Sequence, residues 1–229
     1  MSVYFVTGTD TDAGKTLVTS ALLHAAHQQQ RSTLGLKPIA SGSQSTPEGL
    51  RNSDAIALQQ QSVPAVTYDT VNPITFEPAI APHLAALEAG QPLEVGAITA
   101  ILRETLGQTA RDFSLIEGAG GWRVPLNEQQ DFADLAIALE LPVILVVGLK
   151  LGCLNHARLT AEAIRADGLI LAGWAGSVVD PAFAAAPERF EANIAHLNAK
   201  LEAPCLGIIP HLASPDAATA HHYLSLEAL

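Results

Sequence analysis

The 229-residue sequence has few cysteines and no long apolar run. Its two cysteines, Cys153 and Cys205, show no paired spacing, which argues against a disulfide framework or a zinc motif and fits a reducing compartment. The longest apolar stretch, residues 141–149, is far shorter than the ~20 residues that span a bilayer. The N-terminus lacks the basic region of a secretory signal peptide. We therefore expect a cytoplasmic protein that spans no membrane.

Positive charge is also scarce, with 12 lysines and arginines against 23 acidic residues and a formal net charge of −11. This balance argues against binding to nucleic acid or to an anionic membrane, because both attract basic proteins. With 48% hydrophobic and 15% charged residues, the chain can bury a large core. Its length suits one α/β domain and no linker or repeat divides it, so a single domain over residues 1–229 is expected.

Short apolar runs alternate along the chain with longer segments of helical spacing. The predicted strands are residues 3–7, 33–38, 113–117, 143–147, 172–178 and 206–209, and the predicted helices are residues 16–29, 53–61, 94–111, 134–139, 155–166 and 187–200. Continuous apolar strands separated by helices are typical of an α/β fold with a mostly parallel sheet and helices on both faces. The least regular part, residues 40–92, is a long excursion of a kind that is often functional.

The first predicted strand leads directly into Gly8-Thr9-Asp10-Thr11-Asp12-Ala13-Gly14-Lys15-Thr16 and then into the first helix. This is a variant phosphate-binding loop, with five residues between its glycines where the common pattern has four. N–H groups at the helix start can bind phosphate oxygens, Lys15 can reach the β- and γ-phosphates, and Thr16 can bind Mg²⁺. The flanking strand and helix favour a P-loop NTPase over a chance Gly-Lys-Thr.

Two acidic residues lie near this loop in the predicted fold. Asp12 is either an N-cap or first-turn carboxylate of the first helix or a group that faces the ribose, base or cofactor side of the site, and the sequence leaves both open. Glu117 ends the third predicted strand, where a P-loop protein holds a second Mg²⁺ ligand, and the glycines that follow let the backbone approach a nucleotide. The alternative is a charged residue at an ordinary strand exit.

Three of the four lysines, Lys15, Lys37 and Lys150, follow predicted strands. Ligands of open α/β sheets bind along that edge, so this placement favours anion binding, although each lysine alone is commonly a surface residue. Asp54 lies in the first turn of a predicted helix with Ser53 as its N-cap, which fits helix capping as well as metal binding. The eight histidines form no metal or triad motif, and the adjacent His221 and His222 are expected to point apart on a helix.

Residues 152–155 open a helix directly after Lys150. An exposed helix N-terminus can bind a carboxylate, because its N–H groups have no partner within the helix. An ordinary strand–helix turn fits the sequence equally well.

Five blocks of sequence are more specific than the loop alone: VTGTDTDAGKT (6–16), LKPIASG (36–42), RNSDA (51–55), EGAGGW (117–122) and VGLKLGCLNHA (147–157). In order, and over nearly the whole chain, they resemble the dethiobiotin synthetase family. The resemblance implies a ligase of biotin synthesis that acts on 7,8-diaminononanoate, CO₂ and ATP, with Mg²⁺ as cofactor. It implies a carbamate and a carbamic–phosphoric anhydride as intermediates, and a homodimer with a shared active site.

The resemblance also assigns roles to individual residues. Lys15 and Lys37 are expected to be catalytic, and Thr16, Asp54 and Glu117 to bind Mg²⁺. The residues expected to bind the diamine substrate are Thr11, Ser41, Gly152, Cys153, Leu154 and Asn155, the last four across the dimer interface. The residues expected along the nucleotide are Asp12, Ala13, Gly14, Lys15, Thr16, Leu17, Asp54, Glu117, Gly118, Ala119, Gly120, Ser177, Val178, Pro210, His211, Leu212 and Asp216.

The sequence departs from the family pattern where the base is read. Ser177 stands where the family usually has Asn, His211 replaces an aromatic residue, and Asp216 takes the place of another acidic residue after a short deletion, which leaves base selectivity open. Two other interpretations share the fold. A cobyrinate-type synthetase usually carries a glutaminase domain, for which the chain has no room, and a partitioning-type ATPase carries an early loop lysine where this chain has Thr9 and Asp10.

Overall fold

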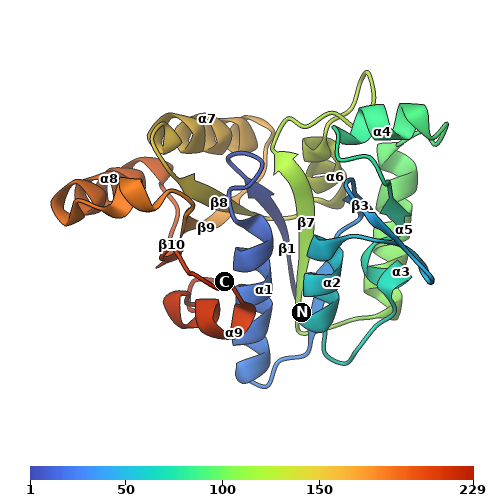
Figure 1. Cartoon of the computed structure of the whole chain (residues 1–229), viewed down its shortest axis with the longest axis horizontal. Helices are drawn as coiled ribbons and strands as arrows, with labels where there is room; N and C mark the ends of the chain where they lie inside the picture. Colours follow the sequence, from blue (N-terminus) through green and yellow to red (C-terminus); the bar gives the residue numbers. More distant parts are fainter.

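A computed structural model describes all 229 residues and places helices on both faces of a central sheet (Figure 1). The sheet has the order β10-β9-β8-β1-β7-β2, and every neighbouring pair is parallel. Its strands are β1 (Ser2–Gly8), β2 (Thr33–Leu36), β7 (Phe113–Gly121), β8 (Val143–Leu149), β9 (Leu171–Val178) and β10 (Cys205–Ile209). These are the six predicted strands, with ends that differ by at most four residues.

Alternate residues of each strand supply two separate hydrophobic cores, because side chains along a strand point to opposite faces. In β8, for example, Val143, Leu145 and Val147 pack in one core, whereas Ile144 and Val146 pack in the other. All five consecutive positions are therefore apolar, as a strand that is covered on both faces requires.

Two groups of helices cover the sheet (Figure 1). The first core is closed by α5 (Val95–Gln108), α6 (Phe132–Leu139), α7 (Cys153–Ala166) and α8 (Pro187–Leu201). The second is closed by α1 (Lys15–Gln28), α2 (Ser53–Gln60), α3 (Tyr68–Val71) and α9 (Ala217–Ala220). The six predicted helices are confirmed within three residues at each end. None of the helices combines the length and apolar character that a membrane span requires.

The irregular region after β2 contains short elements that the sequence did not predict. They are β3 (Ile39–Ala40), β4 (Gln44–Thr46), β5 (Gly49–Arg51), β6 (Ile74–Thr75), α3 and α4 (Pro82–Glu88). The predicted N-cap of α2 was wrong: the cap is Asn52, whose side-chain oxygen accepts hydrogen bonds from the Asp54 and Ala55 N–H groups at 3.0 and 3.3 Å. Asp54 does lie in the first helical turn, as predicted.

The histidine prediction near the C-terminus was also wrong. His221 and His222 lie in a short 3₁₀ turn, η2 (His221–Tyr223), where their ring centroids are 3.9 Å apart. The His221 ring also packs 4.7 Å from the ring of His24 on α1. Contact with α1 and the tight turn bring together two rings that a regular exposed helix would separate. A second 3₁₀ turn, η1 (Pro181–Ala184), precedes α8.

Candidate active site

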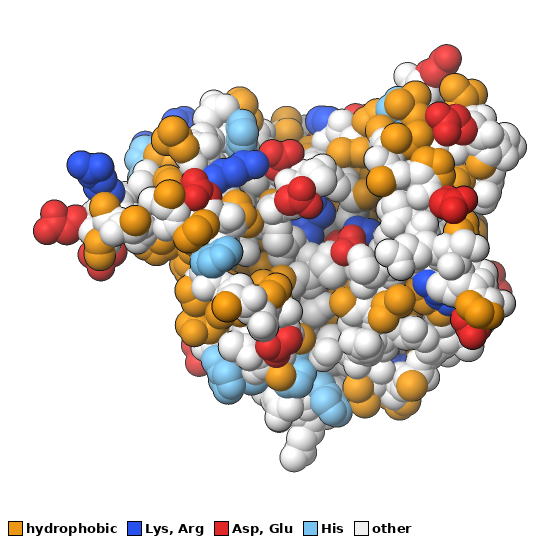
Figure 2. All heavy atoms as spheres, viewed as in Figure 1, with side chains coloured by type: hydrophobic (Ala, Val, Ile, Leu, Met, Phe, Trp, Pro, Cys, Tyr) orange, Lys and Arg blue, Asp and Glu red, His pale blue; other side chains and the backbone are white.

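A cavity of about 800 Å³ opens beside the carboxyl ends of β1, β2 and β7. Figure 2 shows it as a hollow in the face of the molecule, with basic and acidic side chains in its depth. The strands are parallel, so the segments that leave them meet at one edge of the sheet. The cavity lining comes from the P-loop, residues 37–41, the start of α2, residues 79–82 and residues 119–125.

The P-loop wraps around the start of α1. Lys15 is the first helical residue and Gly14 is the N-cap, with a left-handed φ of 87°. A Cβ on Gly14 would lie 2.5 Å from the Ser177 hydroxyl oxygen, so only glycine fits there. Asp12 lies before this cap with a φ of 57° and lines the cavity, so it is neither the N-cap nor a carboxylate of the first helical turn.

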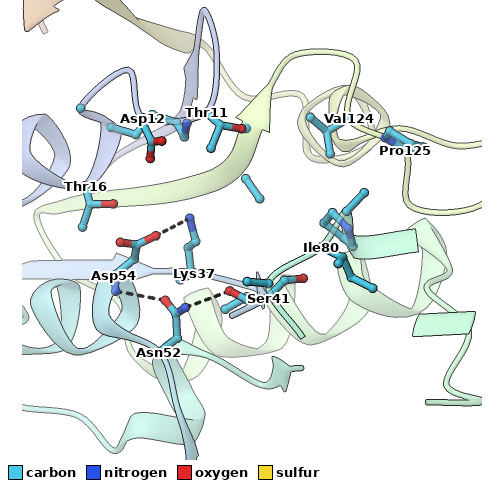
Figure 3. Close-up of a pocket in the computed structure, with 18 of the residues that line it drawn as sticks. Thr11, Asp12, Thr16, Lys37, Ser41, Asn52, Asp54, Ile80, Val124 and Pro125 are labelled. Atoms are coloured by element: carbon cyan, nitrogen blue, oxygen red, sulfur yellow. Dashed lines mark hydrogen bonds and ion pairs between the residues drawn. The ribbon is translucent and has the colours of Figure 1, made fainter. Parts of the chain in front are cut away.

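Lys37, which lines the cavity, forms a buried ion pair with Glu117. Lys37 Nζ donates to Glu117 Oε1 at 2.8 Å and to the Gly118 carbonyl at 2.9 Å. Asp54 Oδ2 lies 3.4 Å from the same ammonium group, and the two side chains point toward each other in Figure 3. Thr16 Oγ1 donates to Glu117 Oε1 at 2.9 Å. Contacts through Glu117 and Lys37 thus link residues from four separate segments of the chain.

The surroundings of Lys37 keep it protonated. Burial lowers the pKa of Lys37, but the charges of Glu117 and Asp54 and their hydrogen bonds outweigh burial, so its pKa is raised above the ordinary value. Lys15 differs, because burial, together with the positive charge of Lys37, lowers its pKa to about 8. Lys15 Nζ donates to the Asp10 carbonyl at 3.0 Å. The cavity therefore holds two lysines whose proton affinities are shifted in opposite directions.

Two side-chain oxygens at the cavity are buried without a hydrogen-bond partner. They are Glu117 Oε2 and the Ser41 hydroxyl. Buried polar atoms are nearly always paired, so each is an acceptor or donor open to a bound group. Ser41 and Thr11, the two residues predicted to bind the substrate from this side of the sheet, both line the cavity.

The structure does not bring every predicted residue into this cavity. Gly152 caps α7 at a φ of 96°, Asn155 is exposed and Cys153 is buried, and none of them lines it. Val178, Pro210 and His211 line a separate apolar groove of about 470 Å³ that also contains Phe190 and Tyr223. Asp216 lines a third hollow beside Thr16, Leu17 and Asp54, and its side chain caps α9 by accepting from the Thr219 N–H at 2.8 Å.

Sequence reasoning missed several cavity residues. Asn52 donates to the Ser41 carbonyl at 3.2 Å and caps α2, so it holds the segments of Ser41 and Asp54 together (Figure 3). Its place beside Asp54 in the RNSDA block was an available signal. The other missed lining residues are Ala40, Ala79, Ile80, Ala81, Pro82, Arg123, Val124 and Pro125. Most are apolar, and nothing in their pattern distinguishes a cavity wall from core.

Comparison with known proteins agrees with the fold. The profile of a family described as an AAA domain matches residues 2–219. Among solved structures, the MinD cell division protein of Aquifex aeolicus matches with a TM-score of 0.55 at 14% identity, covering 93% of this chain and 83% of that chain. The chloroplast FtsY of Physcomitrella patens gives a TM-score of 0.51 at 15% identity, over 99% and 62%. The fold and the loop define a P-loop nucleotide-binding protein.

Comparison with curated relatives is more specific. The ATP-dependent dethiobiotin synthetase of Chromohalobacter salexigens is 59% identical over 99% of this chain and 98% of its own length. That of Pseudomonas aeruginosa PAO1 is 54% identical over 96% of each chain. The chain belongs to the dethiobiotin synthetase family of ATP-dependent ligases.

Proposed function

We propose that the protein forms dethiobiotin, ADP and phosphate from 7,8-diaminononanoate, CO₂ and ATP within a single domain of residues 1–229. One observation carries the proposal: Lys15, Thr16, Lys37 and Asp54 line one cavity beside the start of α1, and the buried Glu117 is hydrogen-bonded to Thr16 and Lys37. Family membership supports the same reaction. The reaction needs no protein nucleophile, so a site made of cations, carboxylates and a phosphate loop suits it.

The residues present fit a Mg²⁺ ion bound together with ATP phosphates. No group of three His, Cys, Asp or Glu side chains forms a metal cluster in the chain. Mg²⁺ commonly takes one or two carboxylates, and phosphate oxygens and water complete its shell. Glu117, with one buried unpaired oxygen, Asp54 and the Thr16 hydroxyl would hold it. Such an ion would neutralise charge that develops on the phosphates.

The proposed chemistry has three steps. One amine of the substrate adds to CO₂ and loses a proton, which gives a carbamate. A carbamate oxygen then attacks the γ-phosphorus and ADP leaves, so a carbamic–phosphoric anhydride forms. The second amine attacks the carbonyl carbon and expels phosphate, which closes the cyclic urea. Two anions must approach in the second step, and the cationic Lys15 and Lys37 offset their repulsion.

The position of Lys37 defines its part in these steps. Its ammonium donates to Glu117 and to the Gly118 carbonyl, so Lys37 acts as a fixed positive charge and a hydrogen-bond donor. Its ammonium lies 2.8 Å from Glu117 and beside Ser41 in the cavity, which is where the carbamate would meet the γ-phosphate. Thr11 and Ser41 would orient the diamine.

The carboxylate end of the substrate requires a second anion site, several carbons from the diamine. We propose that residues 152–155 of a second copy of the chain supply it in a homodimer. The Cys153 and Asn155 N–H groups donate to the Lys150 and Gly152 carbonyls at 3.0 and 3.1 Å, which leaves the Leu154 N–H and the helix dipole to attract a negative charge there.

The proposal is tested by incubating the purified protein with MgATP, bicarbonate and the diamine and identifying the product by mass. Dethiobiotin formed with one ADP per product supports it. ATP hydrolysis that the diamine does not stimulate, with no cyclic urea, would indicate a switch-type ATPase. Incorporation of glutamine-derived nitrogen into a carboxylate substrate would indicate a cobyrinate-type synthetase.

A further inference from the structure

Three polar contacts tie the tip of the P-loop to the end of β8. The Thr9 N–H donates to the Val146 carbonyl at 2.9 Å, and the Gly148 N–H donates to Thr9 Oγ1 at 3.2 Å. Lys150 Nζ donates to Asp10 Oδ2 at 3.0 Å. The first contact extends the pairing of β1 with β8. The third contact joins two side chains, so it requires these two residue types and does not follow from strand pairing.

Asp10 contacts two lysines through different atoms. Its carboxylate pairs with Lys150, while its backbone carbonyl accepts from Lys15 Nζ at 3.0 Å. The other carboxylate oxygen accepts from the Thr11 N–H at 2.8 Å. The Asp10 carboxylate is therefore hydrogen-bonded to Lys150 and to the Thr11 N–H, whereas Lys15 of the phosphate loop contacts only the backbone carbonyl of this residue.

Charge explains why the partner of the Asp10 carboxylate matters. A carboxylate beside the phosphate loop repels a bound polyphosphate and attracts Lys15. The hydrogen bond from Lys150 holds the pKa of Asp10 below its usual value, so the carboxylate is ionised at neutral pH. His156, in the first turns of α7, adds a weaker attraction. Lys150 is the cation that pairs with this carboxylate.

We propose that Lys150 is a positioning residue for nucleotide binding, which keeps the Asp10 carboxylate away from Lys15 and the phosphates. The inference rests on the proposed function in taking Lys15 as a phosphate ligand. Lys150 does not line the cavity, and its ammonium is already engaged by Asp10, so it acts through another residue. Side-chain exposures of 37% for Lys150 and 46% for Asp10 imply that the pair adds little to folding stability.

The test is a double-mutant cycle on MgATP affinity, measured by calorimetry without diamine. In Lys150→Met the affinity is expected to fall about ten-fold, within the range of coupled charged neighbours. In the Lys150→Met/Asp10→Asn double variant it is expected to return to within about three-fold of wild type, because no carboxylate remains to be held. Lys200→Met, on the exposed face of α8, removes the same charge and is expected to change nothing.

Two results would overturn the proposal. Unchanged affinity in Lys150→Met would show that Asp10 needs no restraint. An equal loss in the single and the double variant would show that Lys150 binds an anion itself. Thermal midpoints recorded on the same samples exclude misfolding as the cause of a loss. Absence of dethiobiotin from wild-type reactions would contradict the proposed function. The double-mutant cycle could still be interpreted in that case, because it measures only MgATP affinity.

Discussion

The two ends of the proposed nucleotide site differ in how their polar groups are held. At the phosphate end, Lys37 and Glu117 are 4% and 0% exposed and are joined at 2.8 Å, and Thr16 is hydrogen-bonded to the same carboxylate. At the base end, Val178, Pro210 and His211 line an apolar groove, and His211 is exposed. Ser177 is buried against Gly14 of the P-loop.

This difference indicates where binding energy is concentrated. Charged groups held rigidly in a buried site act strongly on a polyphosphate and cost no reorganisation when it binds. An apolar groove contributes contact area to any base but distinguishes bases poorly, because discrimination requires paired donors and acceptors. We therefore expect substitutions at the phosphate end to have large effects on turnover, and substitutions at the base end to have small ones.

The largest effect is expected for Lys15→Ala. Removing a charge contact that stabilises the transferring phosphoryl group is expected to lower kcat by about 10²–10³. The measurement is dethiobiotin formation under saturating substrates. Near-wild-type kcat would contradict the P-loop assignment and with it the comparison between the two ends.

Lys37→Gln is expected to lower kcat by about 10² while MgATP binding persists, because Lys37 serves the carbamate rather than the nucleotide. Glu117 would lose its buried partner, so the thermal midpoint is expected to fall as well. Calorimetry with MgATP on the same preparation shows whether the variant is folded. If ATP affinity falls as much as turnover, Lys37 is a nucleotide ligand instead.

The same two ends differ in how far the sequence predicts them. The phosphate end follows from local rules, since the strand, loop and helix of residues 2–28 are contiguous and Glu117 ends an apolar strand. The Asn52 cap and the cavity wall at residues 79–82 depend on tertiary packing of short elements, which no periodicity encodes. The arrangement of His221 and His222 escapes prediction for the same reason, because contact with α1 sets it.

A mixed dimer tests the proposed second anion site. Asn155→Ala is expected to raise KM for the diamine about ten-fold with little change in KM for ATP, because only the carboxylate site is altered. Lys37→Gln chains mixed with Asn155→Asp chains are expected to regain activity, since one of the two sites in each mixed dimer is intact. An active monomer in sedimentation, or no recovery on mixing, would refute a shared site.

The lowered pKa of Lys15 predicts a pH dependence of nucleotide affinity. Lys15 is protonated below pH ~8 and loses its charge above it, so MgATP binding is expected to weaken by up to about ten-fold per pH unit as pH rises from 8. Lys37 keeps its proton over this range, because its pKa is raised. In Lys15→Arg the guanidinium stays charged, so its residual binding should be flat. A wild-type profile that stays flat well above pH ~8 would contradict the shift.

The smallest effect is expected at the base end. Ser177 offers one hydroxyl, where the Asn of the family pattern offers an amide donor and acceptor together. Weak discrimination should follow, with kcat/KM for ATP and CTP within about ten-fold of each other, since a lost polar contact changes binding modestly when no group is left buried and unpaired. Ser177→Asn would sharpen the preference only if Gly14, which lies against this side chain, leaves room for the amide. Ser177→Ala, which keeps the small volume, is the matched control and is expected to leave the ratio unchanged. An ATP/CTP ratio of kcat/KM in the hundreds for wild type would show that backbone groups near Pro210 read the base. The base end would then discriminate strongly between nucleotides despite its apolar groove.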